Sequence, residues 1–425
     1  VQTCALPIYY QGPINLLHYF IMATHKAPDC NYSIVSSLDN NVKSILDQID
    51  EDEAFWVADM NRPRESLSLW EEHLPDVKPY YAMKCCDEPN LLQFLADRGV
   101  GFDCASKTEI ETILKLDVEP SKILFSHPIK SKAALRYAKE EGVEKLVFDT
   151  KEELEKILKY YPDAEVYLRV KPKFTNAKIQ LSDKFGAPPE EVEDLLKAAR
   201  DLGANFIGFS FHVGSLCDDI TTFRVALEYV SDLKRMAEEN DLTVSFIDIG
   251  GGFLPPNSQA NHTFPSIANA IEDAIEEFFD DDEIEFVAEP GRFISSEYMD
   301  LHLPVICSKK FTNNNGELIQ SIYIPDGMYG AFNSLSYDHA EPHFEMYFNN
   351  EKEENDETKI NTTLWGQTCD SADVIYDNME WPNLHTGDLL SISKFSAYTY
   401  SPTSFFNGFK HHQVFVINKE SDGEY

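Results

Sequence analysis

From residue 78 onward, short apolar runs alternate eight times with amphipathic stretches at helical spacing. The runs are "YYAMK", "VGFDCAS", "ILFSH", "KLVFD", "EVYLRV", "FIGFSFHVG", "SFIDIGGGF" and "EFVAEPGR". Such runs are typical of buried strands, and the stretches between them are typical of helices that cover a sheet. Eight strand–helix units in succession predict an α/β fold with a closed, parallel (β/α)8 barrel of the TIM type.

Beyond residue 300 the pattern changes. The runs "LPVICSKKF", "SIYIPDG", "DLLSISKF" and "HHQVFVIN" predict strands, and no long helical stretch separates them. We therefore expect a C-terminal antiparallel β-barrel or sandwich domain, to which "AFWVAD" at residues 54–59 adds a strand. The predicted boundaries are 60–298 for the barrel, and 22–59 together with 299–425 for the β domain.

The N-terminal stretch is set apart from this pattern. Residues 1–21 contain no Lys or Arg, so they lack the basic start of a signal peptide. Their first letters, "VQTCALPI", match the translation of a sequencing adapter. We expect residues 1–21 to be an artefact of sequence assembly, with Met22 as the true start.

The charge of the chain limits its partners. It has 36 Lys and Arg against 73 Asp and Glu, a formal net charge of −37. This balance argues against nucleic acid and anionic membranes as partners, and it suits either a small cationic ligand or simple solubility. The eight cysteines form no CxxC pair and no disulfide-like spacing, so we expect reduced thiols, no metal site and a cytoplasmic protein.

Polar residues fall at the carboxyl ends of the predicted barrel strands. A barrel gathers these ends around one opening, where its chemistry usually takes place. Any one of these residues alone is more often structural, but their convergence on one rim predicts a site. They are Lys84, Asp103, Arg169, His212, Gly250, Gly251, Gly252 and Glu289.

Two glycine motifs indicate the ligand. In "IDIGGGF" three glycines follow a strand, and in "EPGR" Gly291 and Arg292 follow the next one. Backbone amides in such turns can approach a phosphate closely. Beside a lysine at the rim, they suggest a phosphorylated aldehyde held on Lys84 as a Schiff base, which is pyridoxal 5′-phosphate.

An ordered set of motifs then identifies a family. "YAMKC", "FDCASKTEI", "SFHVGS", "DIGGGF", "EPGR", "DGMYGAFN", "YDHA", "WGQTCD", "AYT" and "FNGF" occur in this order. The sequence resembles the eukaryotic ornithine decarboxylases, which have the alanine-racemase-like fold, from about residue 30 to 420. The resemblance implies decarboxylation of L-ornithine to putrescine in polyamine biosynthesis.

The resemblance also implies roles for individual residues. Lys84 would bind the cofactor, Glu289 would keep its pyridine nitrogen protonated, and His212 would lie against the ring. The remaining cofactor-binding residues would be Asp103, Arg169, Ser215, Gly250, Gly251, Gly252, Gly291, Arg292 and Tyr398.

The substrate residues would come from two subunits. Asp338 and Asp370 would hold the distal ammonium of ornithine, Tyr329 would line the site, and Cys369 would deliver a proton after CO2 leaves. In the family, Cys369 and Asp370 come from the partner chain of a homodimer. Decarboxylases of arginine or diaminopimelate carry Glu-Ser after this cysteine, so Asp370 favours ornithine, with lysine as the alternative.

Other readings remain open. Antizyme inhibitors are relatives that bind antizyme and have lost the cofactor chemistry, but the residues that such decoys lose are all present here. An amino-acid racemase on the same barrel would not explain "WGQTCD". Three positions depart from the family: Leu216 and Ser396 stand where Gly is usual, and Cys86 where Asn is usual.

Two further contacts are expected from the resemblance. Residues 121–160 hold nine Lys and Arg against seven acids in a strongly acidic chain, and the family binds acidic antizyme there. Salt-bridged surface helices would explain this composition equally well. Lys184 and Asp373 match positions that pair between subunits.

Overall fold

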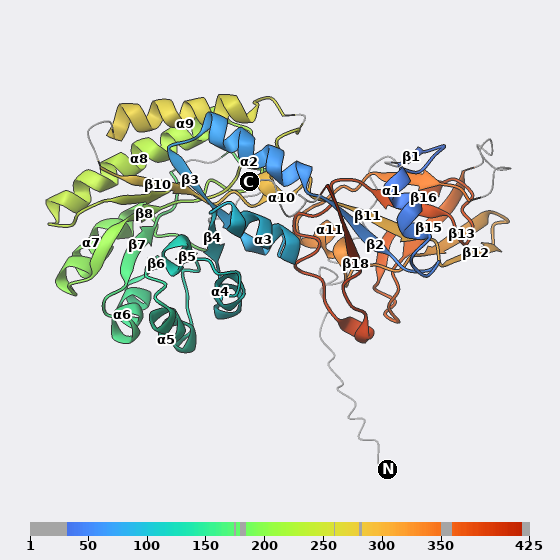
Figure 1. Cartoon of the computed structure of the whole chain (residues 1–425), viewed down its shortest axis with the longest axis horizontal. Coiled ribbons are helices and arrows are strands. Elements are labelled where there is room, and N and C mark those ends of the chain that lie inside the picture. Colours follow the sequence, from blue (N-terminus) through green and yellow to red (C-terminus); the bar gives the residue numbers. More distant parts are fainter. Residues whose placement is uncertain are drawn as a thin grey trace, which may run out of the picture.

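A computed structural model of the chain describes residues 32–173, 176–178, 184–258, 260–279, 283–349 and 359–418. The expectations for residues 1–21 and for the ends of the predicted β domain lie outside the described residues. The chain forms a helix-rich part and a strand-rich part that lie side by side (Figure 1). None of the described helices is long and apolar enough to cross a membrane.

The helix-rich part is the predicted parallel barrel, so the fold class is confirmed. Its strands close in the order β10-β3-β4-β5-β6-β7-β8-β9. They are β3 (Val77–Ala82), β4 (Gly101–Cys104), β5 (Ile123–Phe125), β6 (Lys145–Phe148), β7 (Glu165–Arg169), β8 (Asn205–Ser210), β9 (Phe246–Asp248) and β10 (Glu285–Ala288).

Helices surround the barrel on its outside, as Figure 1 shows. Side chains cap several of these helices: Ser106, for example, accepts a hydrogen bond from the Glu109 amide at 3.2 Å and so caps α4. The helices are α2 (Asn61–His73), α3 (Pro89–Asp97), α4 (Lys107–Leu114), α5 (Lys132–Glu141), α6 (Lys151–Tyr160), α7 (Pro189–Asp201), α8 (Ile220–Glu239), α9 (Phe264–Phe279) and the short α10 (Arg292–Ser295).

The interior of the barrel is filled by side chains. Seven strands each contribute one buried residue to a single apolar cluster, which leaves no channel through the barrel. Polar chemistry is therefore confined to the ends of the strands. The cluster comprises Tyr80, Leu124, Val147, Tyr167, Ile207, Phe246 and Val287.

The β domain contains two sheets. The six-stranded sheet has the order β1-β14-β17-β11-β2-β18, and the four-stranded sheet has the order β12-β13-β15-β16. Most pairs are antiparallel, as expected, but β1–β14, β2–β18 and β13–β15 are parallel. The strands are β1 (Tyr32–Ile34), β2 (Phe55–Asp59), β11 (Met299–Pro304), β12 (Cys307–Thr312), β13 (Leu318–Tyr323), β14 (Phe344–Tyr347), β15 (Ile360–Trp365), β16 (Val374–Trp381), β17 (Leu389–Ile392) and β18 (Gln413–Ile417).

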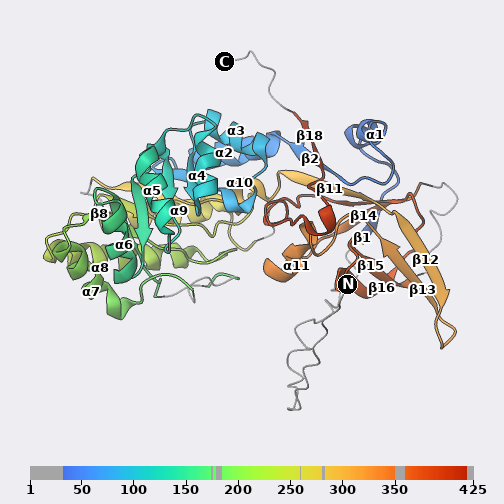
Figure 2. The ribbon, with the colours of Figure 1, turned by 90° about the horizontal axis from the view of Figure 1, so that it is seen from below.

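Short helices complete this domain. Helix α1 (Asn40–Leu46) buries Val42 and Ile45 against the six-stranded sheet. Helix α11 (Ser334–Tyr337) lies between the barrel and the four-stranded sheet (Figure 2).

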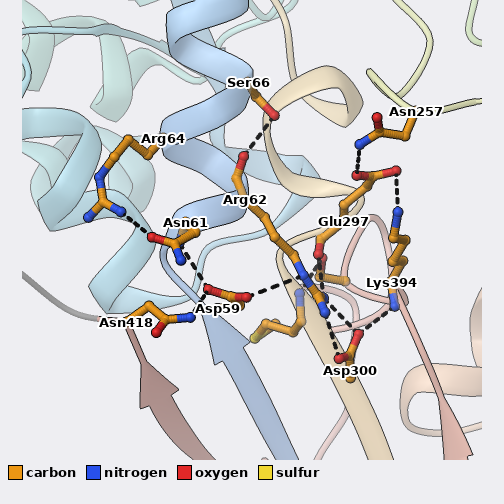
Figure 3. A network of polar contacts seen from close by, with 12 residues as sticks. Asp59, Asn61, Arg62, Arg64, Ser66, Asn257, Glu297, Asp300, Lys394 and Asn418 are labelled. Atoms are coloured by element: carbon orange, nitrogen blue, oxygen red, sulfur yellow. Dashed lines mark hydrogen bonds and ion pairs between the residues drawn. The ribbon is translucent and has the colours of Figure 1, made fainter.

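A polar network joins the two parts where the chain passes between them (Figure 3). Arg62 at the start of α2 donates to both carboxylate oxygens of Asp300 on β11, at 2.7 and 2.9 Å. Glu297 accepts from Lys394 at 2.9 Å and from Asn257 of the barrel at 2.7 Å. A bidentate arginine pair of this kind restricts relative rotation of the parts it joins.

Candidate active site

Lys84 lies just beyond β3, in a short 3-10 helix (Met83–Cys85). Its ammonium forms an ion pair with Asp103 at the end of β4. Asp103 is fully buried, whereas the Lys84 side chain is 44% exposed because it projects into the open end of the barrel. Burial lowers the pKa of Lys84, but the carboxylates of Asp103 and Glu289 outweigh that effect and raise it.

Three buried carboxyl groups meet at this end of the barrel. Asp103, Asp248 at the end of β9, and Glu289 just after β10 are each less than a tenth exposed. Burial raises the pKa of Glu289, and Asp103 adds to the effect, while Lys84 and Arg169 oppose it. Burial also raises the pKa of Asp248, with Glu289 as the next cause.

His212 follows β8 and is held in a neutral form. Its Nδ1 accepts a hydrogen bond from the Gly214 amide at 3.0 Å. Burial lowers the pKa of His212 to about 3, and the positive charges of Arg169 and Lys84 act in the same direction. A neutral imidazole in this position can pack flat against an aromatic ring.

The glycine run after β9 lies directly on the loop after β8. Gly250 and Gly252 have φ angles of +68° and +109°. A Cβ at Gly250 would come within 2.2 Å of the Phe211 carbonyl oxygen, and one at Gly252 within 2.5 Å of the Gly214 carbonyl oxygen. Any side chain here would separate the two loops, so the glycines are required by packing as well as suited to an anion.

The other predicted phosphate ligands gather beside this run. The Arg292 Nε lies 3.4 Å from the Ser215 hydroxyl, and its guanidinium lies 5.0 Å from the centre of the Tyr398 ring. Tyr398 is positioned by its amide, which donates to the Cys85 carbonyl at 2.7 Å. The hydroxyls, the guanidinium and the glycine loop thus come from four segments far apart in the sequence.

These residues fit pyridoxal phosphate. Lys84 offers an amine, the glycine loop with Arg292 offers a phosphate cradle, and the carboxyl cluster offers a partner for a protonated ring nitrogen. Asp103 Oδ1 is buried and has no hydrogen-bond partner in the part of the chain that the structure describes, which marks it as an acceptor for a ligand.

Arg292 has a second contact that the sequence does not predict. It donates to both oxygens of Asp338, the residue after α11, at 2.6 and 3.1 Å. Both side chains are mostly buried, at 12% and 14% exposed. A predicted phosphate ligand and a predicted substrate ligand therefore form one ion pair across the two domains.

The remaining predicted residues form a separate cluster within the β domain. Tyr329 donates its hydroxyl hydrogen bond to Asp370 and stacks on Phe406 at 4.4 Å. The Cys369 amide donates to Asn407 at 2.9 Å, and Cys369 itself is exposed. Among the described residues, the hydrogen bonds of Cys369 and Asp370 stay within the β domain, so one chain does not bring them to Lys84.

The pairing of Lys184 with Asp373 of a partner stays a prediction, and within one chain Asp373 already has hydrogen-bond partners. Asp373 is 1% exposed, and its two carboxylate oxygens accept hydrogen bonds from the amides of Met328 and Thr368, at 2.7 and 3.0 Å. This carboxylate shapes the loop that carries Tyr329 rather than facing outward.

The three departures from the family have different structural consequences. Leu216 has a left-handed φ of +57°, which strains a branched side chain. Ser396 is fully buried, and its hydroxyl donates to the Ser295 carbonyl oxygen. Cys86 is buried, and its carbonyl accepts a hydrogen bond from Tyr81 at 2.9 Å.

Sequence reasoning missed three residues of the site. Asp248 sits within "IDIGGGF" but reads as part of the strand. The Ser126 hydroxyl lies 3.3 Å from the Tyr167 hydroxyl, and Ser126 opposes the rise in the pKa of Glu289. Asp326 accepts hydrogen bonds from the amides of Gly327 and Ala331, at 2.6 and 2.9 Å, and orders the Tyr329 loop. Only the position of Ser126 and Asp248 at strand ends could have indicated them.

Known proteins share this fold and sequence. Residues 61–296 match the family model "Pyridoxal-dependent decarboxylase, pyridoxal binding domain". Ornithine decarboxylase of Caenorhabditis elegans is 36% identical over 89% of this chain and 91% of its own length. Antizyme inhibitor 2 of Xenopus laevis is also 36% identical, over 87% of this chain and 82% of its own.

A solved structure agrees. The arginine decarboxylase of Paramecium bursaria Chlorella virus matches with a TM-score of 0.81 and 32% identity, over 89% of this chain and all of its own. The match of the family model, the extent of the similarity to these relatives and the residues that fit the cofactor lead to one conclusion: the chain belongs to the pyridoxal-dependent decarboxylases, whose cofactor is pyridoxal 5′-phosphate.

Proposed function

We propose that the protein decarboxylates L-ornithine to putrescine. The observation that carries this proposal is the complete group at the end of the barrel, in which Lys84, Asp103 and Glu289 lie beside the glycine loop and Arg292. A relative that had lost the cofactor chemistry would not need to keep both the amine of Lys84 and the carboxyl groups of Asp103 and Glu289. The similarity to ornithine decarboxylases of several eukaryotes supports the choice of substrate.

The residues around the cofactor would have distinct tasks. When bound, the cofactor supplies an electron-poor ring that accepts the electron pair released as CO2 leaves. Lys84 would hold it covalently, and Glu289 would hold a proton at the ring nitrogen. His212, neutral because of its lowered pKa, would pack on the ring face. Asp103 and Arg169 would orient these groups, and Ser215, Gly250, Gly251, Gly252, Gly291, Arg292 and Tyr398 would hold the phosphate.

Substrate choice would depend on Asp338 and Asp370. Two carboxylates around one distal ammonium provide matched charge, and Tyr329 orders Asp370 through its hydrogen bond. Lysine is longer than ornithine by one methylene, a difference that binding pockets discriminate by only about 10- to 200-fold. An assay must therefore compare ornithine and lysine side by side.

A decarboxylation assay tests the proposal directly. We expect release of CO2 from ornithine to exceed release from lysine, arginine and diaminopimelate. Lys84→Ala should lose nearly all turnover and the absorbance of covalently bound cofactor. Lys107→Ala, which changes an exposed lysine in α4, should retain both. Full activity in Lys84→Ala would contradict the mechanism, and absence of bound cofactor in the wild type would favour an antizyme-inhibitor-like protein.

We also propose a homodimer in which each site is completed by its partner. Cys369 is exposed. Four large aromatic side chains in or next to the motifs "YDHA" and "FNGF" are exposed as well: Tyr337, Phe405, Phe406 and Phe409. Large exposed aromatic side chains of this kind are typical of interfaces. The partner's cysteine would then deliver the proton to the substrate carbon.

Residues 121–160 support a further proposed partner, antizyme. Three of the charged residues in this segment are buried and so do not belong to the surface: Lys130, Asp149 and Glu153. Eight basic residues then remain against five acids, mainly on α5 and α6. We expect Lys132→Glu with Lys139→Glu to weaken capture of antizyme at low salt, whereas Lys197→Glu on α7 should have no effect. No capture by the wild type at low salt would exclude this surface.

The setting we propose is the cytoplasm. All six cysteines for which the structure describes a state are unpaired thiols, four of them buried. Reduced thiols are typical of cytosolic proteins.

A further inference from the structure

The loop that carries Tyr329 is wrapped around two buried carboxyl groups. Asp326 and Asp373 are 2% and 1% exposed. A Cβ at Gly330 would come within 1.9 Å of an Asp326 oxygen, and one at Gly327 would meet Asp373 at 2.2 Å, so the loop fits closely around both groups. A buried carboxylate is costly unless its oxygens are hydrogen-bonded and its charge is matched. The partners of these two groups therefore decide how firmly the loop is held.

Asp326 has one partner from the C-terminal segment of the chain. Its Oδ1 accepts hydrogen bonds from the amides of Gly327 and Ala331 in the loop, at 2.6 and 2.9 Å. Its Oδ2 lies 3.0 Å from Nε2 of His412, and a carboxylate only accepts, so the imidazole is the donor. Both side chains are mostly buried, at 3% and 15% exposed. Among the described residues, His412 is the only side chain that is hydrogen-bonded to Asp326.

His412 is itself held by a regular element. It directly precedes β18, which pairs with β2 along its whole length in the six-stranded sheet. The cavity between His412, Asp326 and Tyr329 measures only about 20 Å³, which is room for about one water molecule. The imidazole therefore bridges a fixed strand and the loop, with little space in which either could shift.

The same segment contacts the proposed substrate cluster at two further points. Phe406 stacks on the Tyr329 ring, with 4.4 Å between the ring centres. Asn407 accepts a hydrogen bond from the Cys369 amide at 2.9 Å. Residues 404–412, which include the motif "FNGF", thus form a clasp on this cluster.

We propose that His412 is a positioning residue for substrate binding. Through Asp326 it holds the loop in place, so that Tyr329 keeps its hydrogen bond to Asp370. This inference rests on the proposed function, in which Asp370 holds the distal ammonium of ornithine. Because His412 acts on the substrate cluster and not on the cofactor-binding group at the end of the barrel, its loss should change KM more than kcat.

Hydrogen exchange tests the contact without any turnover. The amides of Gly327 and Ala331 donate to Asp326, so their exchange reports how firmly that carboxylate is held. In the holoenzyme, we expect His412→Ala to speed exchange in residues 326–333 by about tenfold, because a hydrogen bond to a buried charged group is lost. His412→Gln should restore the wild-type rate, since its amide places a donor at a similar reach from the backbone.

His411→Ala is the matched control. His411 belongs to the same segment, but its ring stacks on Tyr400, with 4.5 Å between the ring centres. Exchange in residues 326–333 should therefore stay at the wild-type rate in this variant. Unchanged exchange in His412→Ala would overturn the proposal, since the loop would then be held without the imidazole. Equal acceleration in His411→Ala would overturn it too, because any damage to the segment would loosen the loop.

Kinetics separates positioning of the substrate from a general effect on stability. His412→Ala should raise the KM for ornithine about tenfold while kcat changes by less than about threefold, and His412→Gln should recover the wild-type KM. A fall in kcat at unchanged KM would overturn the positioning role, as would faster exchange with both constants unchanged. If the wild type released no CO2 from ornithine, the proposed function would fail, whereas the exchange result would still decide whether His412 holds the loop.

Discussion

Leu216 is a residue whose backbone conformation conflicts with its side chain. Its φ of +57° lies in the left-handed region, where a branched residue is strained by about 1–2 kcal/mol relative to Gly. It follows Ser215 in the loop that meets the glycine run, so the strain is stored at the edge of the site. Leu216→Gly should therefore release it.

The matched control for Leu216→Gly is Leu202→Gly. Leu202 is also a partly exposed leucine, but its φ is −83°, so glycine relieves nothing there. Both variants gain the same freedom in the unfolded chain, and that cost cancels in the comparison. We expect Leu216→Gly to be more stable than Leu202→Gly by about 1 kcal/mol in denaturant unfolding. Equal destabilisation by the two changes would mean that the loop relaxes around Leu216.

The ion pair between Arg292 and Asp338 joins a proposed phosphate ligand to a proposed substrate ligand. If Arg292 holds the cofactor phosphate as proposed, that phosphate must compete with a bidentate carboxylate for the guanidinium. Asp338→Asn removes the charge but keeps the shape. We expect the apoprotein to bind inorganic phosphate about tenfold more tightly, as measured by calorimetry, because one charge-assisted contact no longer opposes binding.

The same change should act in the opposite direction on the substrate. Asp338→Asn should raise the KM for ornithine, since the carboxylate that we propose to hold its distal ammonium is lost. Glu345→Gln, which changes a β-domain carboxylate on β14, serves as the control and should alter neither quantity. Unchanged phosphate affinity in Asp338→Asn would show that Arg292 is free to bind anions despite the pair.

At the scale of elements, Lys130 joins the segment before α5 to α6 and β6. Its side chain is fully buried, and its ammonium donates to the carbonyl oxygens of Val147 and His127, at 2.5 and 2.9 Å, beside Glu153. Burial lowers the pKa of Lys130 to about 8, although Glu153 opposes the shift. In the sequence this lysine counts as part of a basic surface, but its buried ammonium instead links neighbouring elements of the barrel.

The lowered pKa predicts how stability depends on pH. Between about pH 8 and 10.5 the unfolded chain holds a proton on Lys130 that the folded chain has released. Stability therefore rises with pH across this window, by up to about 3 kcal/mol from this group. We expect Lys130→Met to lack this rise, as measured by denaturant unfolding at several pH values. Lys159→Met, an exposed lysine of α6, should keep it. If the stability of Lys130→Met rose with pH by the same amount, the rise would come from other titratable groups.

The sequence predicts the elements and the rim of the site because both depend on local patterns. Parallel strands must point their carboxyl ends to one side, so the sequence alone predicts that Lys84, Asp103 and Glu289 lie close together. Lys130 could not be placed, because a lysine in a basic segment gives no local sign that it turns inward. The contacts of Arg292 with Asp338 and of Asp373 with its loop depend on how two domains and distant loops pack, which no local pattern specifies.

At the scale of the whole molecule, the predicted site residues lie in two separate places. Lys84 and its neighbours lie at the end of the barrel, whereas Cys369, Asp370 and Tyr329 form their own cluster in the β domain. A twofold dimer can bring the barrel of one chain to the β domain of the other, and each interface then completes two sites. Complementation between damaged subunits tests this architecture.

Lys84→Ala and Cys369→Ala homodimers should each be severely impaired. After mixing and subunit exchange, random pairing makes about half of the dimers mixed, and each mixed dimer holds one doubly damaged site and one intact site. Activity should therefore recover to about a quarter of the wild-type value. A mixture of Lys84→Ala with Glu289→Ala is the control, because both residues belong to the same barrel and every site then keeps one defect. If the first mixture stays as inactive as the control after verified exchange, each chain must complete its own site, and the two clusters would have to meet by movement within one chain.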